Sequence, residues 1–210
     1  MKERPIIFLG EMVRAILDGR KTQTRRVVKK LPPLSEGFEW SFDKTIDDLW
    51  EVGALNNSTG EGSLFDYIKC PYGIPGDRLW VRETWSQIDN REFGGDQHVE
   101  YKADTGNPYP GEWPEDEAKG NPEAPKWKPS IFMPRWASRI TLEVTDIRVE
   151  MVQDISEEDA KREGVLEMGT VDRGGYYSGF ADLWDAINAK RGYGWDVNPF
   201  VWVVGFEVVP

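Results

Sequence analysis

The chain has 210 residues and a formal net charge of −11 at pH 7, from 26 Lys and Arg against 37 Asp and Glu. This length fits one domain enlarged by insertions better than two full domains, since a single core grows comfortably to this size. The acidic balance argues against non-specific binding of nucleic acid, because that binding draws its affinity from Lys and Arg side chains that neutralise phosphates.

Cysteine and histidine each occur once, as Cys70 and His98. A single cysteine excludes an intrachain disulfide, and the two residues together cannot form a Cys/His zinc cluster. A Ser-His-Asp or Cys-His active site would have to use His98, and we do not favour that interpretation. No apolar run is long enough for a secretion signal or a membrane span. We therefore expect a cytoplasmic protein with no metal or other cofactor and no membrane partner.

A strand, a helix and a second strand are predicted at the N-terminus. Residues 4 to 10, RPIIFLG, have the apolar run of a short strand. In residues 11 to 19, EMVRAILDG, apolar side chains recur at helical spacing and a glycine follows them, as is common at helix ends. Residues 22 to 28, TQTRRVV, alternate like a strand that places Thr24 on one face. Lys21 then lies in the turn between the helix and the strand.

Two large insertions follow, at about residues 29 to 72 and 86 to 130. The first mixes Pro, Gly, Ser, Asn and acidic residues around isolated aromatic residues, which predicts irregular structure. The second has one predicted strand in HVEYKA, residues 98 to 103, and an acidic loop rich in Pro and Gly at residues 104 to 126. Between the insertions, a Pro-Gly-Asp turn leads into a strand at residues 78 to 83.

The strand at residues 78 to 83 has one mainly apolar face and one face with Arg78, Trp80 and Arg82. Two arginines on either side of a tryptophan can receive an anion beside a flat ring. The alternative is structural, with the tryptophan packed beneath an insertion and the arginines paired with acidic residues.

A strand and a capped helix follow the second insertion. Residues 140 to 149 alternate like a strand, and in DISEEDAKREGV Ser156 and Asp159 form a capping box. Gly164 fits the position just after the helix. Glu163 then lies in the last turn, where a carboxylate faces the negative end of the helix dipole. This breach of a local rule is a modest indication of function.

A longer helix and a last strand complete the chain. Residues 177 to 192 place Phe180 and Trp184 on one helical face, and residues 198 to 209 form an apolar run that fits a buried strand. Strands outnumber helices, and the helices are short. We therefore predict an α+β fold, mainly β, in which residues 1 to 210 form one domain, a small barrel with helical and loop additions.

Lys21, Thr24 and Glu163 are candidate catalytic residues. A lysine amine acts as a base or nucleophile only when neutral, and desolvation or neighbouring cations such as Arg20 lower its pKa toward that state. A threonine hydroxyl becomes a nucleophile when a base such as lysine takes its proton. Glu163 can carry a proton to a leaving amine or hold the lysine in place, so the group supports hydrolysis of an amide or ester. The structural alternative is that cations complement the helix end and the threonine is an ordinary strand residue.

Three motifs, GRKTQTRR at residues 19 to 26, PGDRLWVRE at residues 75 to 83 and the closing strand FVWVVGFEV, resemble the ASCH family. The domain of that family is a small β-barrel of the PUA-like kind. The insertions resemble those of ASCH-like proteins from phages and prophages, which implies a phage or prophage origin. The resemblance covers residues 1 to 28, 73 to 85, 138 to 165 and 199 to 209.

Within this family, the sequence is similar to the bacterial amidohydrolases that remove the acetyl group from N4-acetylcytidine. Their catalytic lysine, threonine and glutamate fall on Lys21, Thr24 and Glu163. The resemblance therefore implies a metal-independent amidohydrolase that acts on an acylated nucleoside or a related modified base. Those enzymes are smaller and lack both insertions, which here would cover, reshape or close the cleft.

Two other functions stay open. A binding module for single-stranded RNA or a modified base would set arginines, Arg25 among them, against phosphate and stack a tryptophan on a base. A phage factor would instead engage a host protein through the acidic loop. The sequence does not fix the oligomeric state. The residues predicted to contact a ligand are Arg20, Arg26, Arg78, Trp80, Arg82 and Trp85.

Overall fold

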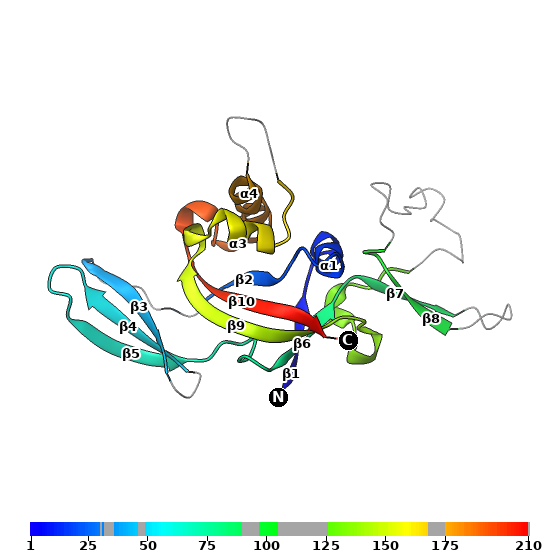
Figure 1. Ribbon diagram of the computed structural model, residues 1–210, viewed down its shortest axis with the longest axis horizontal. Helices are drawn as coiled ribbons and strands as arrows, with labels where there is room; N and C mark the ends of the chain where they lie inside the picture. The colour runs from blue at the N-terminus through cyan, green and yellow to red at the C-terminus, as the bar shows by residue number, and fades with distance from the viewer. Residues whose placement is uncertain are drawn as a thin grey trace.

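A five-stranded sheet forms the centre of the computed structural model, which describes residues 1–29, 31, 36–45, 49–89, 97–104, 126–167 and 175–209. Within these residues the fold is α+β and mostly strand, as predicted. The strand order is β1 (Glu3–Ile7), β6 (Arg78–Arg82), β9 (Thr141–Met151), β10 (Phe200–Val209) and β2 (Gln23–Val27). The pair β1 and β6 is parallel and the other pairs are antiparallel. The sequence patterns predicted all five strands, and Figure 1 shows how strongly β9 curves.

The predicted barrel is wrong in one respect, because the sheet does not close. β1 and β2 are its two edges, and no backbone pairing joins them within the described residues. A side chain spans the gap instead, since Arg26 Nη2 donates a hydrogen bond to the carbonyl oxygen of Ile7 at 2.7 Å. Closure depends on the tilt and stagger of the first and last strands, which alternation along a sequence does not encode.

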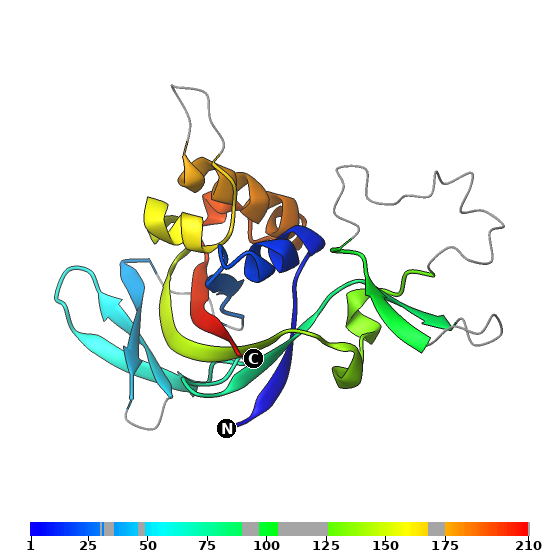
Figure 2. The same cartoon turned by 45° about the vertical axis from the view of Figure 1, so that its right-hand side comes forward.

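Three helices gather above the sheet in Figure 2: α1 (Gly10–Leu17), α3 (Glu157–Arg162) and α4 (Tyr176–Asn188). All three were predicted near these bounds. None of the described helices is long and apolar enough to cross a membrane. Short 3-10 turns complete the helical structure: η2 (Ser130–Phe132), η3 (Arg135–Ala137), η4 (Val152–Asp154), η5 (Ala189–Arg191) and η6 (Trp195–Val197).

The residues of β10 alternate between two hydrophobic clusters. Val201 and Val203 pack in one cluster with Phe180 of α4, and Trp202 lies in the other with helix α1. The helices are thus fixed to the sheet by apolar packing, which places the C-terminal ends of α1 and α3 near β2 (Figure 1).

The first insertion is not irregular as predicted. It contains a three-stranded antiparallel sheet formed by β3 (Phe38–Lys44), β4 (Trp50–Asn56) and β5 (Gly62–Ile68). The aromatic residues that looked isolated in sequence alternate along these strands, and Trp50 packs edge-on against Trp202 of the central sheet. Pairing between neighbouring strands, rather than a strong pattern within one strand, makes this region regular.

The second insertion contains a hairpin of β7 (Trp85–Asp89) and β8 (Gln97–Tyr101). β8 confirms the predicted strand, and β7 was not predicted. The hairpin and the β3–β5 sheet lie at opposite ends of the molecule (Figure 1). Residues 105 to 125, most of the predicted acidic loop, lie outside the described residues.

Candidate active site

The turn that carries Lys21 begins where α1 ends. Gly19 has φ +72°, a left-handed conformation that glycine adopts without strain. The backbone N–H groups of Arg20 and Lys21 both donate to the carbonyl oxygen of Ala15, each at 2.9 Å. These bonds satisfy the helix end and turn the chain so that Lys21 forms a β-bridge with Glu163.

The end of α3 supplies the other half of this junction. Ser156 caps the helix, since its hydroxyl accepts a hydrogen bond from the N–H of Asp159 at 3.1 Å. The predicted capping box is incomplete, because the Asp159 carboxylate accepts hydrogen bonds from Arg25 and Arg148. Gly164 follows the helix with φ +82°, and a Cβ on it would lie 2.7 Å from the Cβ atoms of both Ala15 and Lys21. Only glycine therefore lets the two helix ends approach so closely.

Lys21 and Glu163 meet in a dry ion pair. The Lys21 Nζ donates to the Glu163 carboxylate oxygen Oε2 at 2.7 Å and to its backbone carbonyl oxygen at 2.7 Å. The side chains are 0% and 3% exposed. Arg25 Nη1 donates to the other carboxylate oxygen, Oε1, at 3.2 Å. Two cations thus compensate the carboxylate that the helix dipole disfavours.

Arg25 belongs to a wider ionic group and is not available to phosphate, contrary to the prediction of the RNA-binding hypothesis. Its side chain is 0% exposed and also pairs with Asp159, at 3.1 Å, and with Glu150. Arg148 donates to the same two carboxylates, at 2.7 Å to Asp159 and 2.9 Å to Glu150. Arg148 also pairs with Asp146 at 3.6 Å, so the group joins three cations, Lys21, Arg25 and Arg148, to four carboxylates.

The pKa of Lys21 is lowered from its ordinary value of 10.5. Burial is the main cause, because it penalises the charged amine, and Glu163 acts in the opposite direction. The charges of Arg26 and Arg25 lower the pKa further. The arginines that lower the pKa of Lys21 are therefore Arg25 and Arg26. Arg20 instead donates to Asp18 at 2.9 Å and to the carbonyl oxygen of Gly164 at 2.9 Å.

Two clefts adjoin Glu163, which lines both. The larger, called the β2/α4 cleft here, has a volume of about 510 Å³ and lies between β2 and α4, with Thr24 and Arg26 in its wall. The smaller, of about 390 Å³, lies beside α1 and includes Arg20. Lys21 lines neither cleft, because its side chain is fully buried behind Glu163. The remaining lining residues of the β2/α4 cleft are Met12, Arg25, Val27, Lys29, Tyr72, Phe180, Leu183, Trp184, Ile187, Asn188, Arg191 and Tyr193.

Thr24 is the candidate nucleophile that lines the β2/α4 cleft. The residue is 3% exposed, and its hydroxyl forms no hydrogen bond with any side chain or backbone group of the described chain. An unengaged hydroxyl in a cleft wall is free to meet a bound substrate.

The other predicted ligand residues lie elsewhere. Arg78, Trp80, Arg82 and Trp85 line neither cleft beside Glu163. The Arg82 guanidinium stacks 4.6 Å from the centre of the Trp80 ring, and Trp85 is buried. The predicted ligand residues therefore do not share one cleft. A ligand that contacts Arg78, Trp80, Arg82 or Trp85 would bind at a different surface from the clefts that include Arg20 and Arg26.

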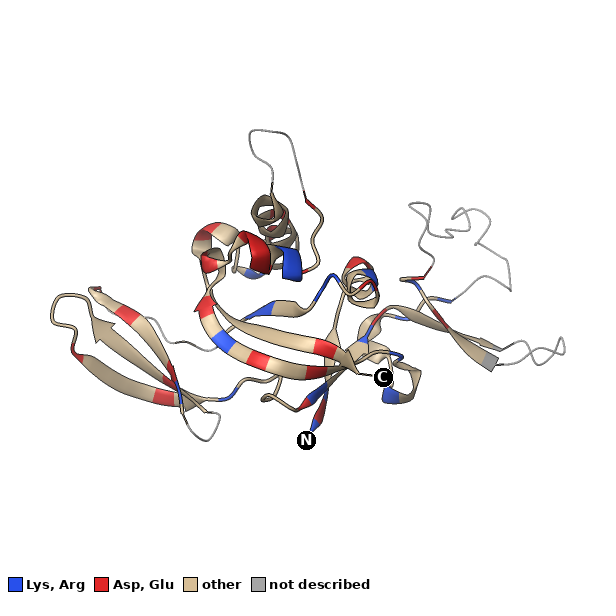
Figure 3. Ribbon diagram, in the orientation of Figure 1, with Lys and Arg blue, Asp and Glu red and all other residues tan. Residues whose placement is uncertain are grey.

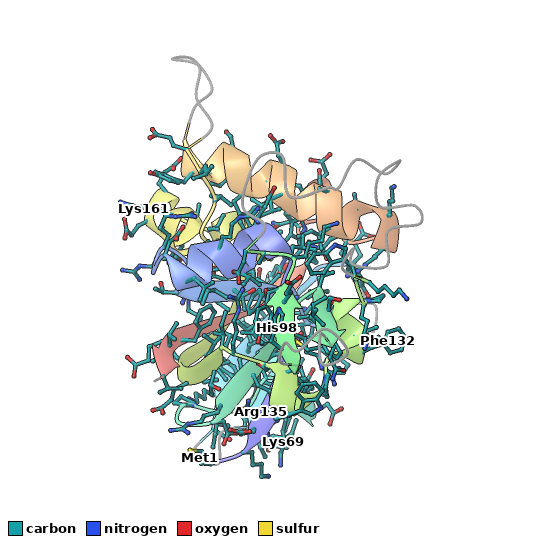
Figure 4. All side chains as sticks on the ribbon, turned by 90° about the vertical axis from the view of Figure 1, so that its right-hand side faces the viewer. Met1, Lys69, His98, Phe132, Arg135 and Lys161 are labelled. Carbon is teal, nitrogen blue, oxygen red and sulfur yellow. The ribbon has the colours of Figure 1, made fainter. Side chains whose placement is uncertain are left out.

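His98 also lies away from the clefts. It is on β8, in the hairpin that faces the viewer in Figure 4, and its side chain is 49% exposed. The His98 Nε2 lies 3.3 Å from a Glu100 carboxylate oxygen.

Sequence reasoning missed the far wall of the β2/α4 cleft, which includes Tyr72, Asn188 and Arg191. No motif marks these residues, since a basic residue at the C-terminal end of a helix is favourable for the helix itself. Lys29, another lining residue, was assigned to an insertion. Only the fold brings these segments together.

Lys21, Glu163 and Thr24 combine a titratable amine, a carboxylate and an unengaged hydroxyl beside a cleft. Comparisons of this chain with protein-family models, with curated proteins and with solved structures found no match. The chemistry of these three side chains is therefore the ground on which a function can be assigned.

Proposed function

We propose that this protein is an amidohydrolase that removes the acyl group from an acylated nucleoside such as N4-acetylcytidine. The observation that carries the proposal is the dry Lys21–Glu163 pair at 2.7 Å, next to a cleft with Thr24 in its wall. Buried ionisable groups with shifted pKa values beside a cleft are typical of catalytic sites.

The protonation state of Lys21 is the first requirement. A neutral amine has two N–H donors and one lone pair, and two donors suffice for the two oxygens of Glu163 that Lys21 contacts. The lone pair then stays free to accept a proton. Burial and the neighbouring arginines favour this neutral form, since both lower the pKa of Lys21.

The reaction uses Thr24 as nucleophile and Lys21 as base. Glu163, which lines the cleft and bonds to Lys21, passes the proton of the Thr24 hydroxyl to Lys21 while the hydroxyl oxygen bonds to the acyl carbon. The bond between the acyl carbon and the exocyclic nitrogen then breaks, and Lys21 returns the proton to the leaving amine. In the second half, water loses a proton to Lys21 and attacks the acyl-threonine ester. Thr24 leaves with that proton, and the products are the free nucleoside and a carboxylic acid. Glu163 orients Lys21 throughout and relays each proton between the cleft and Lys21.

The β2/α4 cleft suits a nucleoside in size and lining. Its volume of about 510 Å³ lies within the range typical of small-molecule sites. Aromatic side chains in its wall, among them Tyr72, Trp184 and Tyr193, offer surfaces for a pyrimidine ring. Asn188 adds an amide that can hydrogen-bond to a base edge.

The test is hydrolysis of N4-acetylcytidine, followed by chromatographic separation of cytidine. Thr24→Val and Lys21→Met should each lower kcat/KM by about 10²- to 10⁴-fold, the range typical of nucleophile and base removal. Thr22→Val is the matched control, because Thr22 is two residues away, exposed and outside the β2/α4 cleft.

Thr24→Val is the decisive variant, since the hydroxyl it removes bonds to no described residue and its loss should spare the fold. Circular dichroism and the thermal midpoint identify variants that have lost structure. Turnover that survives both substitutions in folded protein, or that falls equally in Thr22→Val, would contradict the assignment.

A further inference from the structure

The β2/α4 cleft is strongly basic in an acidic protein. Its wall includes four basic residues, Arg25, Arg26, Lys29 and Arg191, and one acidic residue, Glu163. The carboxylate oxygens of Glu163 are already bonded to Lys21 and Arg25.

The other three cations lack acidic partners. Arg26, Lys29 and Arg191 form no ion pair with any carboxylate among the described residues. The Nε of Arg26 is buried and has no hydrogen-bond partner there. Burial is the main cause that lowers the pKa of Arg26; Tyr72 and Glu163 act in the opposite direction, and the charge of Arg191 lowers the pKa further. An unpaired buried donor beside a second arginine is costly unless an anion binds between them.

We propose that Arg26, Lys29 and Arg191 bind the phosphate group of a free mononucleotide in the β2/α4 cleft. The identity of the substrate rests on the proposed function: the acylated nucleoside would be recognised as its phosphate monoester. A phosphate monoester carries nearly two negative charges near neutral pH and three acceptor oxygens, which matches three cations without partners.

The base and the phosphate would occupy different parts of the cleft. Phe180 and Trp184 are each 3% exposed and form an apolar floor, where a ring can pack. Tyr72 lines the wall, and burial raises the pKa of its hydroxyl, which therefore stays protonated and able to donate a hydrogen bond to phosphate. Arg191 follows α4 in η5, and Lys29 follows β2, so the cations lie at the ends of the two elements that form the walls.

A single mononucleotide fits the charge distribution better than a nucleic-acid chain does. Acidic side chains are spread over β3–β5, β9 and α3 (Figure 3), and the net charge of the chain is −11. An extended polyanion would meet this negative surface beyond the cleft, whereas a single phosphate would meet only the three cations.

The experiment compares the binding of cytidine and cytidine 5′-monophosphate by isothermal titration calorimetry, which requires no turnover. We expect the monophosphate to bind at least about tenfold more tightly, equivalent to about 1.4 kcal/mol. This preference should shrink as salt concentration rises, because two of the three cations, Lys29 and Arg191, are exposed. Equal affinities for the two ligands at low salt would overturn the proposal.

Arg191→Gln and Lys29→Gln should each bring the ratio of the two affinities toward one. Lys190→Gln is the matched control, because Lys190 is the exposed neighbour of Arg191 and lies outside the β2/α4 cleft. An equal loss of preference in Lys190→Gln would mean that general surface charge, rather than this cleft, binds the phosphate, and would overturn the site. The two variants remove a charge from different elements of the fold, so a folding defect in one of them would not explain a loss of preference in both.

A third ligand separates a free nucleotide from RNA. A short oligocytidine that binds more tightly than the monophosphate would overturn the assignment to a mononucleotide. Failure of the two proposals is distinguishable: a phosphate preference without hydrolysis of N4-acetylcytidine or its monophosphate removes the amidohydrolase and keeps the anion site. Hydrolysis with no phosphate preference keeps the amidohydrolase and removes the anion site.

Discussion

Two buried glutamates in this protein differ in the cations that they bind. Glu83 pairs with an arginine, whereas Glu163 pairs with a lysine and an arginine. Glu83, 1% exposed, accepts two hydrogen bonds from Arg139, at 3.0 and 3.1 Å, and Arg139 also bonds to Asp104 at 2.6 Å. Burial raises the pKa of the Glu83 carboxyl group despite this arginine. Glu163 is 3% exposed and shares its carboxylate between Lys21 and Arg25.

The difference lies in the cation and in access. Arginine keeps its proton in proteins, so the Glu83 pair can fasten segments together and can carry no proton. Lysine loses its proton when its pKa falls, and Glu163 lines two clefts while Glu83 lines neither. Burial of an ion pair alone therefore does not mark a catalytic site. A titratable partner and an adjoining cleft are needed as well.

The largest difference between the two pairs should appear in the free energy of unfolding when each glutamate is replaced. Glu163→Gln leaves Arg25, and Lys21 whenever it is protonated, without a negative charge in a buried site, and loss of one member of such a pair costs about 3–5 kcal/mol. Glu83→Gln should cost less, about 1–3 kcal/mol, because Arg139 keeps Asp104 and is partly exposed. Urea denaturation measures both free energies of unfolding.

Activity per folded molecule provides the contrast. Glu83→Gln should keep the hydrolysis of N4-acetylcytidine, whereas Glu163→Gln should lose it. A comparable loss in both variants would remove the distinction between a structural and a catalytic pair.

The rise of activity with pH should follow the titration of Lys21. Its pKa in the folded protein lies below 10.5, so the neutral fraction, and with it kcat/KM, should rise with pH with a midpoint below that value. Arg26→Gln removes one of the charges that lower this pKa, and the rising limb should therefore move to higher pH. Stability follows the same sign: as pH falls from 10.5 through the folded pKa, the unfolded chain gains a proton first and the free energy of unfolding decreases.

Arg139→Gln is the matched control for the pH profile, since Arg139 bonds to the other buried glutamate. Its profile should coincide with that of the native protein. A limb that does not move in Arg26→Gln, or that moves equally in Arg139→Gln, would show that Lys21 is not the titrating base.

Local rules of sequence located the helix ends correctly, and they failed where distant segments meet. Gly19, Ser156 and Gly164 predicted the helix ends correctly, because each acts on its own turn of the chain. The misfit of Glu163 with its helix dipole marked this residue as unusual, and the motif resemblance made Lys21 a candidate beside it. The ion pair between the two is seen only in the structure.

The rules that predict helix ends do not predict contacts between segments far apart in the sequence. Arg191 and Arg26 lie in one cleft only because α4 packs against β10, and no motif connects them. The β3–β5 sheet and the open edges of the central sheet depend likewise on pairing between strands. Sequence patterns that describe one element at a time do not determine how its neighbours register.

The smallest effect should come from an exposed pair on α3, the helix that carries Glu163 at its end. Glu158 and Arg162 lie four residues apart on that helix with 3.5 Å between Arg162 Nε and a Glu158 carboxylate oxygen, and their side chains are 65% and 55% exposed. Water screens such a pair, so Glu158→Gln should cost no more than about 0.5 kcal/mol and leave turnover unchanged. Urea denaturation at low and high salt measures it. A cost that approaches that of Glu163→Gln would mean that stability at this helix end comes from the helix itself rather than from the buried junction with Lys21.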